Sequence, residues 1–334
     1  ASLALAAATL AAPAAAQVTL KFSTWVPLKH PISIYIFDPW FAQIEKATQG
    51  RVKFQTLPKP IAAPNQHYEA VVKGQVDISY ATYGYQPERF MPFLIAELPQ
   101  LGDTAVHNGV ALWRTYKSHI EKLGIHKDVE LLGVMTHGPG LFHHTKRPIM
   151  LPDDLKGQKI RVGGDVPKAI VEAFGGVVIS QPAPKSYEIL SQGIADGIMF
   201  PNESLKSFNI ASIVPFTTFV KGGLYSSSFW MAMNKDAWNK IAKPDQDAIH
   251  KLAGEAFARL AGAGWDRADA EGLEAMKASG GKIQEVSPAF VTALSKVTAQ
   301  LEADYAARLD KMGLNGKEVI QVFRNNVKAV AAGK

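Results

Sequence analysis

The chain has 334 residues, 47% of them hydrophobic and 20% charged, which is too polar for a membrane protein and too apolar for a disordered chain. It contains no cysteine, which excludes thiol catalysis and thiolate metal sites, and its length corresponds to about two domains. The net charge of +6 is spread along the chain without a dense basic run, so we expect no nucleic-acid partner.

Residues 1–16 are rich in alanine and resemble the apolar and cleavage regions of a signal peptide. Ala14, Ala15 and Ala16 satisfy the small-x-small cleavage rule, so we expect cleavage between Ala16 and Gln17 and export to the periplasm. The alternative is a flexible alanine-rich tail. No later stretch reaches the roughly 20 apolar residues that span a bilayer.

The remaining chain alternates between strand and helix patterns. Residues 18–22 alternate as in a strand, 34–48 carry apolar residues at helical spacing, and 51–56 alternate again, which predicts an α/β domain. Pro244 begins a helical pattern that runs to about Ser279, a length of roughly 50 Å at the rise of a regular helix. We expect this helix to be bent or to lie across two domains. Two further helices are predicted over 288–312 and 317–331.

An internal echo supports two similarly built halves. A Tyr-Glu pair, a glycine and an aspartate recur at the same spacing in residues 68–77 and 187–196, each time on a short helix followed by an apolar strand. Two glycine-flanked strands are candidate crossings, one leading into residues 137–140 and one following residues 222–223. We therefore predict domain I as residues 17–136 plus 226–265, and domain II as residues 137–225 plus 266–334.

Several ordered motifs resemble those of one protein family. They are Phe22-Ser-Thr-Trp25 with His30-Pro31, Gly74-Gln-Val-Asp77-Ile78, Asp154-Leu-Lys-Gly-Gln-Lys-Ile-Arg161, and Tyr187-Glu188 with Gly193-Ile-Ala-Asp196-Gly197. Over residues 17–330 the chain resembles the substrate-binding subunits of TRAP (tripartite ATP-independent periplasmic) transporters, of the dicarboxylate-binding-protein type.

The resemblance implies a periplasmic binding protein fold, in which hinge strands join two α/β domains and a long C-terminal helix bridges them. It implies that a small organic acid binds between the domains and passes to the membrane permease, without catalysis or a cofactor. The family's carboxylate anchor corresponds to Arg161, whose guanidinium offers a planar fork of donors to a carboxylate. Without the motif, a solvated surface position would be the simpler reading of this arginine.

Further candidates for the pocket follow from their positions at strand ends and on a crossing strand. They are Trp25, His30, Tyr83, Gly84, Tyr85, His137, Phe200, Asn202, Glu203 and Trp230. For each aromatic residue the alternative is packing in the core. In a site for an anion, Glu203 would require a ligand hydroxyl or a positive partner.

Three histidines, His137, His143 and His144, are candidates for metal ligands. Adjacent residues on a strand point to opposite faces, so His143 and His144 cannot readily bind one ion, and we expect no metal site. His137, between a strand and a Gly-Pro-Gly turn, is the better candidate for a neutral hydrogen-bond donor to the ligand.

The ligand class follows from one departure from the family. Sialic-acid binders carry a second arginine upstream of the anchor, where this chain has Leu141, which favours a small monocarboxylate. We rank 2-hydroxy- and 2-oxo-monocarboxylates first, aromatic acids second, and sugar acids or C4 dicarboxylates third. We expect a monomer; a binding protein for a chemosensory receptor is an alternative role, and the chain lacks the common catalytic motifs of an enzyme.

Overall fold

The structure is a computed structural model and describes residues 17–334, so the predicted signal peptide lies outside the described residues. Within them, no helix has the length and apolar character needed to cross a membrane. The strands are β1 (Val18–Ser23), β2 (Val52–Thr56), β3 (Ile78–Thr82), β4 (Val129–Thr136), β5 (Leu141–His144), β6 (Lys159–Val162), β7 (Val177–Ser180), β8 (Gly197–Phe200), β9 (Phe216–Phe219), β10 (Ser228–Asn234) and β11 (Lys282–Glu285). The helices are α1 (Asp38–Ala47), α2 (His67–Val72), α3 (Pro87–Phe90), α4 (Ala105–Thr115), α5 (Asp165–Ala173), α6 (Ser186–Ser191), α7 (Glu203–Ser207), α8 (Lys235–Asn239), α9 (Lys243–Leu252), α10 (Glu255–Ala278), α11 (Pro288–Lys311) and α12 (Gly316–Ala331).

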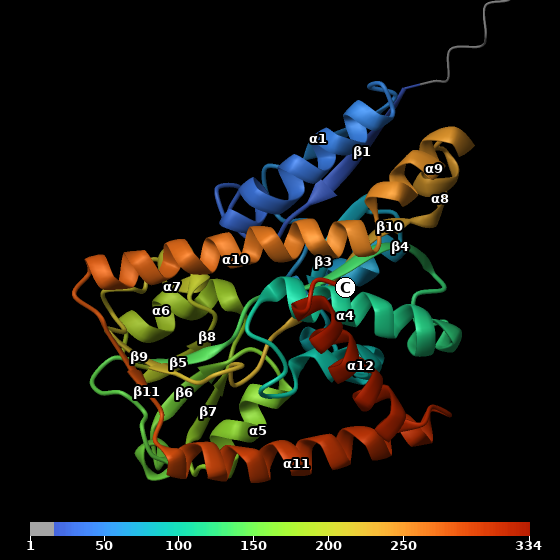
Figure 1. Ribbon diagram of the computed structural model, residues 1–334. Helices are drawn as coiled ribbons and strands as arrows, with labels where there is room; N and C mark the ends of the chain where they lie inside the picture. The colour runs from blue at the N-terminus through green and yellow to red at the C-terminus, as the bar shows by residue number, and fades with distance from the viewer. Residues whose placement is uncertain (1–16) are drawn as a thin grey trace, which may run out of the picture.

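Two sheets organise the molecule into two lobes (Figure 1). The first lobe contains the sheet β2-β1-β3-β10-β4, and the second lobe contains β11-β9-β5-β8-β6-β7. In each sheet three parallel strands, β2-β1-β3 or β7-β6-β8, meet an antiparallel strand, β10 or β5. The two α/β halves predicted from the sequence are confirmed.

The sequence echo has a structural cause that is the same in both lobes. Asp77 precedes β3, and its Oδ2 accepts a hydrogen bond from the backbone nitrogen of Lys21 at 2.8 Å. Asp196 precedes β8, and its Oδ2 accepts from the backbone nitrogen of Lys159 at 2.9 Å. Each aspartate thus fastens the turn after a short helix to the neighbouring parallel strand.

The chain crosses between the lobes in two segments. Residues 137–140 lead from β4 to β5, and residues 220–227 lead from β9 to β10. The crossings lie side by side, because the backbone nitrogen of Gly140 donates to the carbonyl oxygen of Tyr225 at 2.7 Å. Ser226 Oγ also donates to the carbonyl oxygen of His137 at 2.7 Å.

The long helix predicted over residues 244–279 is instead two helices, α9 and α10. The chain breaks at Gly254, whose φ of 61° and ψ of −124° are accessible to glycine but strained for other residues. A Cβ there would also lie 2.6 Å from the Trp113 ring. With 24 residues, α10 is about 36 Å long, and it packs on α4 in the first lobe and α7 in the second. The expected bridge is therefore confirmed, with a shorter helix.

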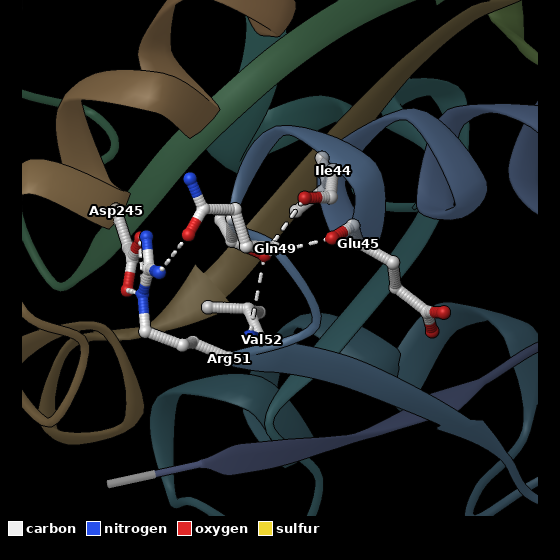
Figure 2. A network of polar contacts seen from close by, with 7 residues as sticks. Ile44, Glu45, Gln49, Arg51, Val52 and Asp245 are labelled. Carbon is white, nitrogen blue, oxygen red and sulfur yellow. Dashed lines mark hydrogen bonds and ion pairs between the residues drawn. The ribbon is translucent and has the colours of Figure 1, made fainter. Parts of the chain in front are cut away.

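Helix α9 is fastened to the first lobe by an ion pair (Figure 2). Arg51 follows the turn after α1, and its Nη2 lies 2.7 Å from Asp245 Oδ1 while its Nε lies 3.0 Å from Oδ2. Gln49 Oε1 accepts a further bond from Arg51 Nη1 at 3.0 Å. This two-pronged contact fixes the start of α9 beside the first sheet.

The C-terminal helices return the chain to the first lobe. We assigned residues 266–334 to the second lobe, but α12 packs on α4, with Val319 and Phe323 in a core cluster of the first lobe. Helix α11 begins beside α5, and Tyr305 near its other end donates from its hydroxyl to the carbonyl oxygen of Pro92 at 2.7 Å. Figure 1 shows α10 running across the molecule, between α1 above it and α7 below it, and α11 along the lower edge. The apolar stripe of a helix shows in the sequence that one face of the helix is buried. It does not show which surface of the protein that face packs on.

Candidate ligand-binding site

A cavity lies between the lobes, at the carboxyl ends of parallel strands of both sheets. Its empty space, which includes open solvent at the mouth, amounts to about 530 Å³. The first lobe contributes Trp25, His30 and Tyr85, and the second contributes Arg161, Phe200 and Glu203. In such α/β folds the strand ends meet where a ligand can contact several segments at once.

Arg161 lies on β6, the strand between β7 and β8. Its neighbours Ile160 and Val162 pack into the core on one face, so strand alternation turns Arg161 to the other face. The carbonyl oxygen of Gln181 accepts from Arg161 Nε at 2.9 Å and from Nη2 at 2.6 Å. This contact occupies one edge of the guanidinium and fixes its plane.

The charge on Arg161 has no carboxylate partner. The side chain is only 1% exposed, and within residues 17–334 no Asp or Glu oxygen lies within 4.0 Å of it. Burial lowers the pKa of Arg161, although the hydroxyl of Tyr85 opposes this effect, and the guanidinium stays charged at any physiological pH. A buried cation without a counter-ion is costly, so an anionic ligand that enters the cavity is strongly stabilised.

Aromatic rings form much of the cavity wall. Arg161 Cζ lies 4.4 Å from the centroid of Phe200, and Phe200 stacks on Phe208 with centroids 5.5 Å apart. On another wall, Phe229 stacks on Trp265 of α10 at 5.8 Å. These surfaces fit a flat apolar group attached to the anion.

Several residues that line this space carry unpartnered polar atoms. The Nε1 atoms of Trp25 and Trp265, Thr82 Oγ1, His30 Nε2 and Glu203 Oε1 are buried and have no hydrogen-bond partner among the described residues. All five residues line the cavity. All but Glu203 can donate a hydrogen bond, which is the polarity that an anion requires.

The lobes touch directly beside Arg161. The hydroxyl oxygen of Tyr85, in the first lobe, accepts a hydrogen bond from the backbone nitrogen of Ala183 in the second, at 3.1 Å. The described conformation thus brings the two lobes into contact at this edge of the cavity.

His137 lines the cavity, but both of its ring nitrogens form hydrogen bonds with the backbone. Nδ1 donates to the carbonyl oxygen of Gly138 at 2.5 Å, and Nε2 accepts from the backbone nitrogen of Ser227 at 3.0 Å. Burial lowers its pKa to about 4, so the ring stays neutral near pH 7. We proposed it as a donor to the ligand; both nitrogens instead bond the backbone of the crossing strands.

Four predicted residues do not line this cavity. Tyr83 is fully buried and stacks on Phe93, with ring centroids 4.2 Å apart. Trp230 follows the cavity residue Phe229 on β10, so strand alternation turns it into the core. Gly84 lies beside the Glu97 carboxylate, and Asn202 lines a separate hollow against α10.

Several lining residues were missed from the sequence. Trp265 is one aromatic residue in a long helix, and only the packing of α10 across both lobes brings it to the cavity. Thr82, Phe208 and Tyr225 carry no motif. No local pattern distinguishes them from core residues.

The histidines weighed as metal ligands bond protein groups. His143 contacts Thr217 Oγ1 at 2.8 Å and the carbonyl oxygen of Phe200 at 3.0 Å, and His144 contacts Gln158 Oε1 at 3.1 Å. Within the described part of the chain, no group of three or more His, Asp or Glu residues could hold a metal ion.

Comparisons with known proteins find the same architecture in related proteins. The family model described as bacterial extracellular solute-binding protein, family 7, matches residues 22–308. A TRAP periplasmic solute-binding protein from Bordetella bronchiseptica with bound (R)- and (S)-mandelate is 37% identical, with a TM-score of 0.90 over 94% of this chain and 99% of that chain. A TRAP solute-binding protein from Rhodoferax ferrireducens with copurified benzoate is 25% identical, with a TM-score of 0.89 over 95% of this chain and 99% of that chain. A protein named outer membrane transporter protein TsaT, from Comamonas testosteroni, is 31% identical over 96% of this chain and 95% of its own length.

Proposed function

Because the chain belongs to family 7 of the bacterial extracellular solute-binding proteins and is a TRAP solute-binding protein, we propose that it binds an aromatic monocarboxylate between its lobes. The observation that carries the proposal is Arg161, a buried cation without a counter-ion in a cavity walled by aromatic rings. The protein would deliver the acid to the membrane permease from the periplasm, as a monomer and without a chemical step.

The ring-lined walls change the order of ligands that we drew from the sequence. Aromatic acids now come first, which agrees with the mandelate and benzoate bound by the two related structures. Mandelate is also a 2-hydroxy acid, so the earlier first choice overlaps with this class. A C4 dicarboxylate ranks behind because the cavity residue Glu203 would repel a second carboxylate.

In the proposed mechanism the second lobe holds the acid first. Arg161 presents its free guanidinium edge to the carboxylate, and Phe200 supports the ring. Rotation about the crossing strands then brings Trp25 and Tyr85 over the ligand, and the Tyr85–Ala183 bond closes the site. Excluding water strengthens the ion pair, because the effective dielectric constant falls.

The test is calorimetric titration of benzoate and (R)-mandelate into the wild type, Arg161→Gln and Arg147→Gln. Arg147 is an exposed arginine and serves as the matched control. Loss of a buried charge-assisted pair should raise the Kd of the Arg161 variant by about a hundredfold or more, while the control stays unchanged. An Arg161 variant that binds both acids normally would refute the assignment.

A further inference from the structure

His30 and Glu203 place one unused donor beside one unused acceptor in the cavity wall. His30 Nε2 and Glu203 Oε1 lie 3.2 Å apart, with side chains 2% and 1% exposed. Despite this distance, neither atom makes a hydrogen bond within the described residues, because the two groups are poorly aligned for a direct bond. Buried polar atoms are usually partnered, so this pair points to a group supplied from outside.

The surrounding bonds fix which atom donates and which accepts. His30 Nδ1 accepts from the backbone nitrogen of Ile32 at 3.2 Å, so the proton of the neutral ring lies on Nε2. Glu203 Oε2 already accepts from Ser204 Oγ at 2.9 Å, which leaves Oε1 as the free acceptor. Burial lowers the pKa of His30 despite the carboxylate beside it, so this arrangement holds near neutral pH.

A hydroxyl group satisfies both atoms together. Its oxygen accepts from His30 Nε2 and its proton is donated to Glu203 Oε1. A ligand ammonium group would meet the imidazole N–H with no acceptor to offer, and a second carboxylate would be repelled by Glu203.

The pair is separated from Arg161 along the wall of rings. The guanidinium lies over Phe200, Phe200 stacks on Phe208, and the centroid of Phe208 lies 5.4 Å from that of His30. A ligand that reaches both ends must carry its carboxylate and its hydroxyl on different sides of the ring. A hydroxyl next to the carboxylate would stay at the Arg161 end.

We propose that His30 and Glu203 form a subsite for a ring hydroxyl group, so that the preferred ligands are aromatic acids hydroxylated at a position remote from the carboxylate. This inference rests on the proposed function, since the carboxylate must be held at Arg161.

The test is calorimetric titration of benzoate and of 2-, 3- and 4-hydroxybenzoate into the wild type, Glu203→Gln, Glu203→Met and His30→Phe. Glu274→Gln, an exposed glutamate on α10, is the matched control. A hydrogen bond to a charged group should make the better of 3- and 4-hydroxybenzoate bind the wild type about tenfold to a hundredfold more tightly than benzoate. The 2-hydroxy isomer should gain little.

Glu203→Met should abolish this preference by weakening the binding of 3- and 4-hydroxybenzoate far more than that of benzoate, since benzoate has no hydroxyl group to bond to the pair. Glu203→Gln keeps an acceptor oxygen and should lose only part of the preference, and a melting curve shows that each variant is folded. Equal affinity of the wild type for benzoate and for 3- and 4-hydroxybenzoate would overturn the subsite and leave the proposed function intact. An equal loss for all four acids in Glu203→Met would likewise overturn it. Failure of the wild type to bind any of them would overturn the proposed function, and the subsite with it.

Discussion

The carboxylate of Asp269 accepts a hydrogen bond from the backbone nitrogen of Glu203, with 2.7 Å between Oδ1 and N. Asp269 lies on α10, so the helix that bridges the lobes also positions a cavity residue. Gly272, on the same helix, allows close approach: a Cβ there would lie 1.9 Å from the carbonyl oxygen of Asn202. The relative position of the lobes and the shape of the cavity therefore depend on the same helix.

Replacing Asp269 should affect both stability and binding. Asp269→Ala leaves the Glu203 N–H without its partner, and we expect a loss of about 1–3 kcal/mol in the free energy of unfolding. Affinity for a hydroxylated aromatic acid should also fall, because Glu203 is no longer fixed. Asp269→Asn keeps the acceptor oxygen and is the control. Urea unfolding and calorimetry measure the two effects, and an alanine variant equal to the asparagine variant in both would contradict the prediction.

Gly254 should tolerate no side chain. Gly254→Ala forces an L-residue into a glycine conformation and brings its Cβ into the Trp113 ring. Gly280→Ala is the control, since φ is 82° there but nothing lies within 4 Å of the new methyl group. We expect about 1 kcal/mol of destabilisation for the control and about 1–3 kcal/mol more for Gly254→Ala. Equal unfolding midpoints would show that the contact with Trp113 relaxes freely.

Substitutions of Tyr83 and Tyr85, which lie two residues apart, should have different effects: the first on stability and the second on ligand binding. Tyr83→Phe removes the hydroxyl that lies 3.0 Å from His126 Nε2 in the core, and should cost about 1–3 kcal/mol of unfolding free energy with no change in ligand Kd. Tyr85→Phe removes a hydrogen bond between the lobes, so it should weaken ligand binding. Thermal melts with and without benzoate measure both, and the reverse pattern would place Tyr83 in the site after all.

Glu97 should make stability depend on pH. Its side chain is 1% exposed, and burial raises its pKa to about 8. Hydrogen bonds from Ser228 oppose this rise, whereas the nearby charge of Asp165 adds to it. The folded state therefore keeps a proton that the unfolded chain releases near its ordinary value of 4.5. The stability contributed by this group is present at low pH and falls, by up to about 1.4 kcal/mol per pH unit, as pH rises from the lower value to the higher.

Glu97→Gln mimics the protonated form, so the unfolding free energy of the variant relative to the wild type should increase from pH 5 to pH 8 and then level off. Urea unfolding of both proteins at each pH measures this difference. A constant difference would mean that Glu97 does not hold a proton in the folded state.

The sequence predicted the order of elements well, because strand alternation, helical spacing and the Asp77 and Asp196 turns are local patterns. Arg161 was found through its motif, and its strand position gives it a direction. The cavity edge was harder to predict. Phe229 and Trp230 are adjacent aromatics, and only the register of β10 decides which one faces the cavity. Trp265 reaches the site through the packing of a helix, which no local pattern specifies.

The packing of α12 on α4 affects when the first lobe can fold during synthesis and export. The first lobe is built from segments near both ends of the chain, since β10 completes its sheet and α12 covers α4. Neither lobe is therefore a contiguous piece that could fold while the rest is still being synthesised or translocated. A chain that emerges N-terminus first cannot complete the core of the first lobe until α12 has also emerged.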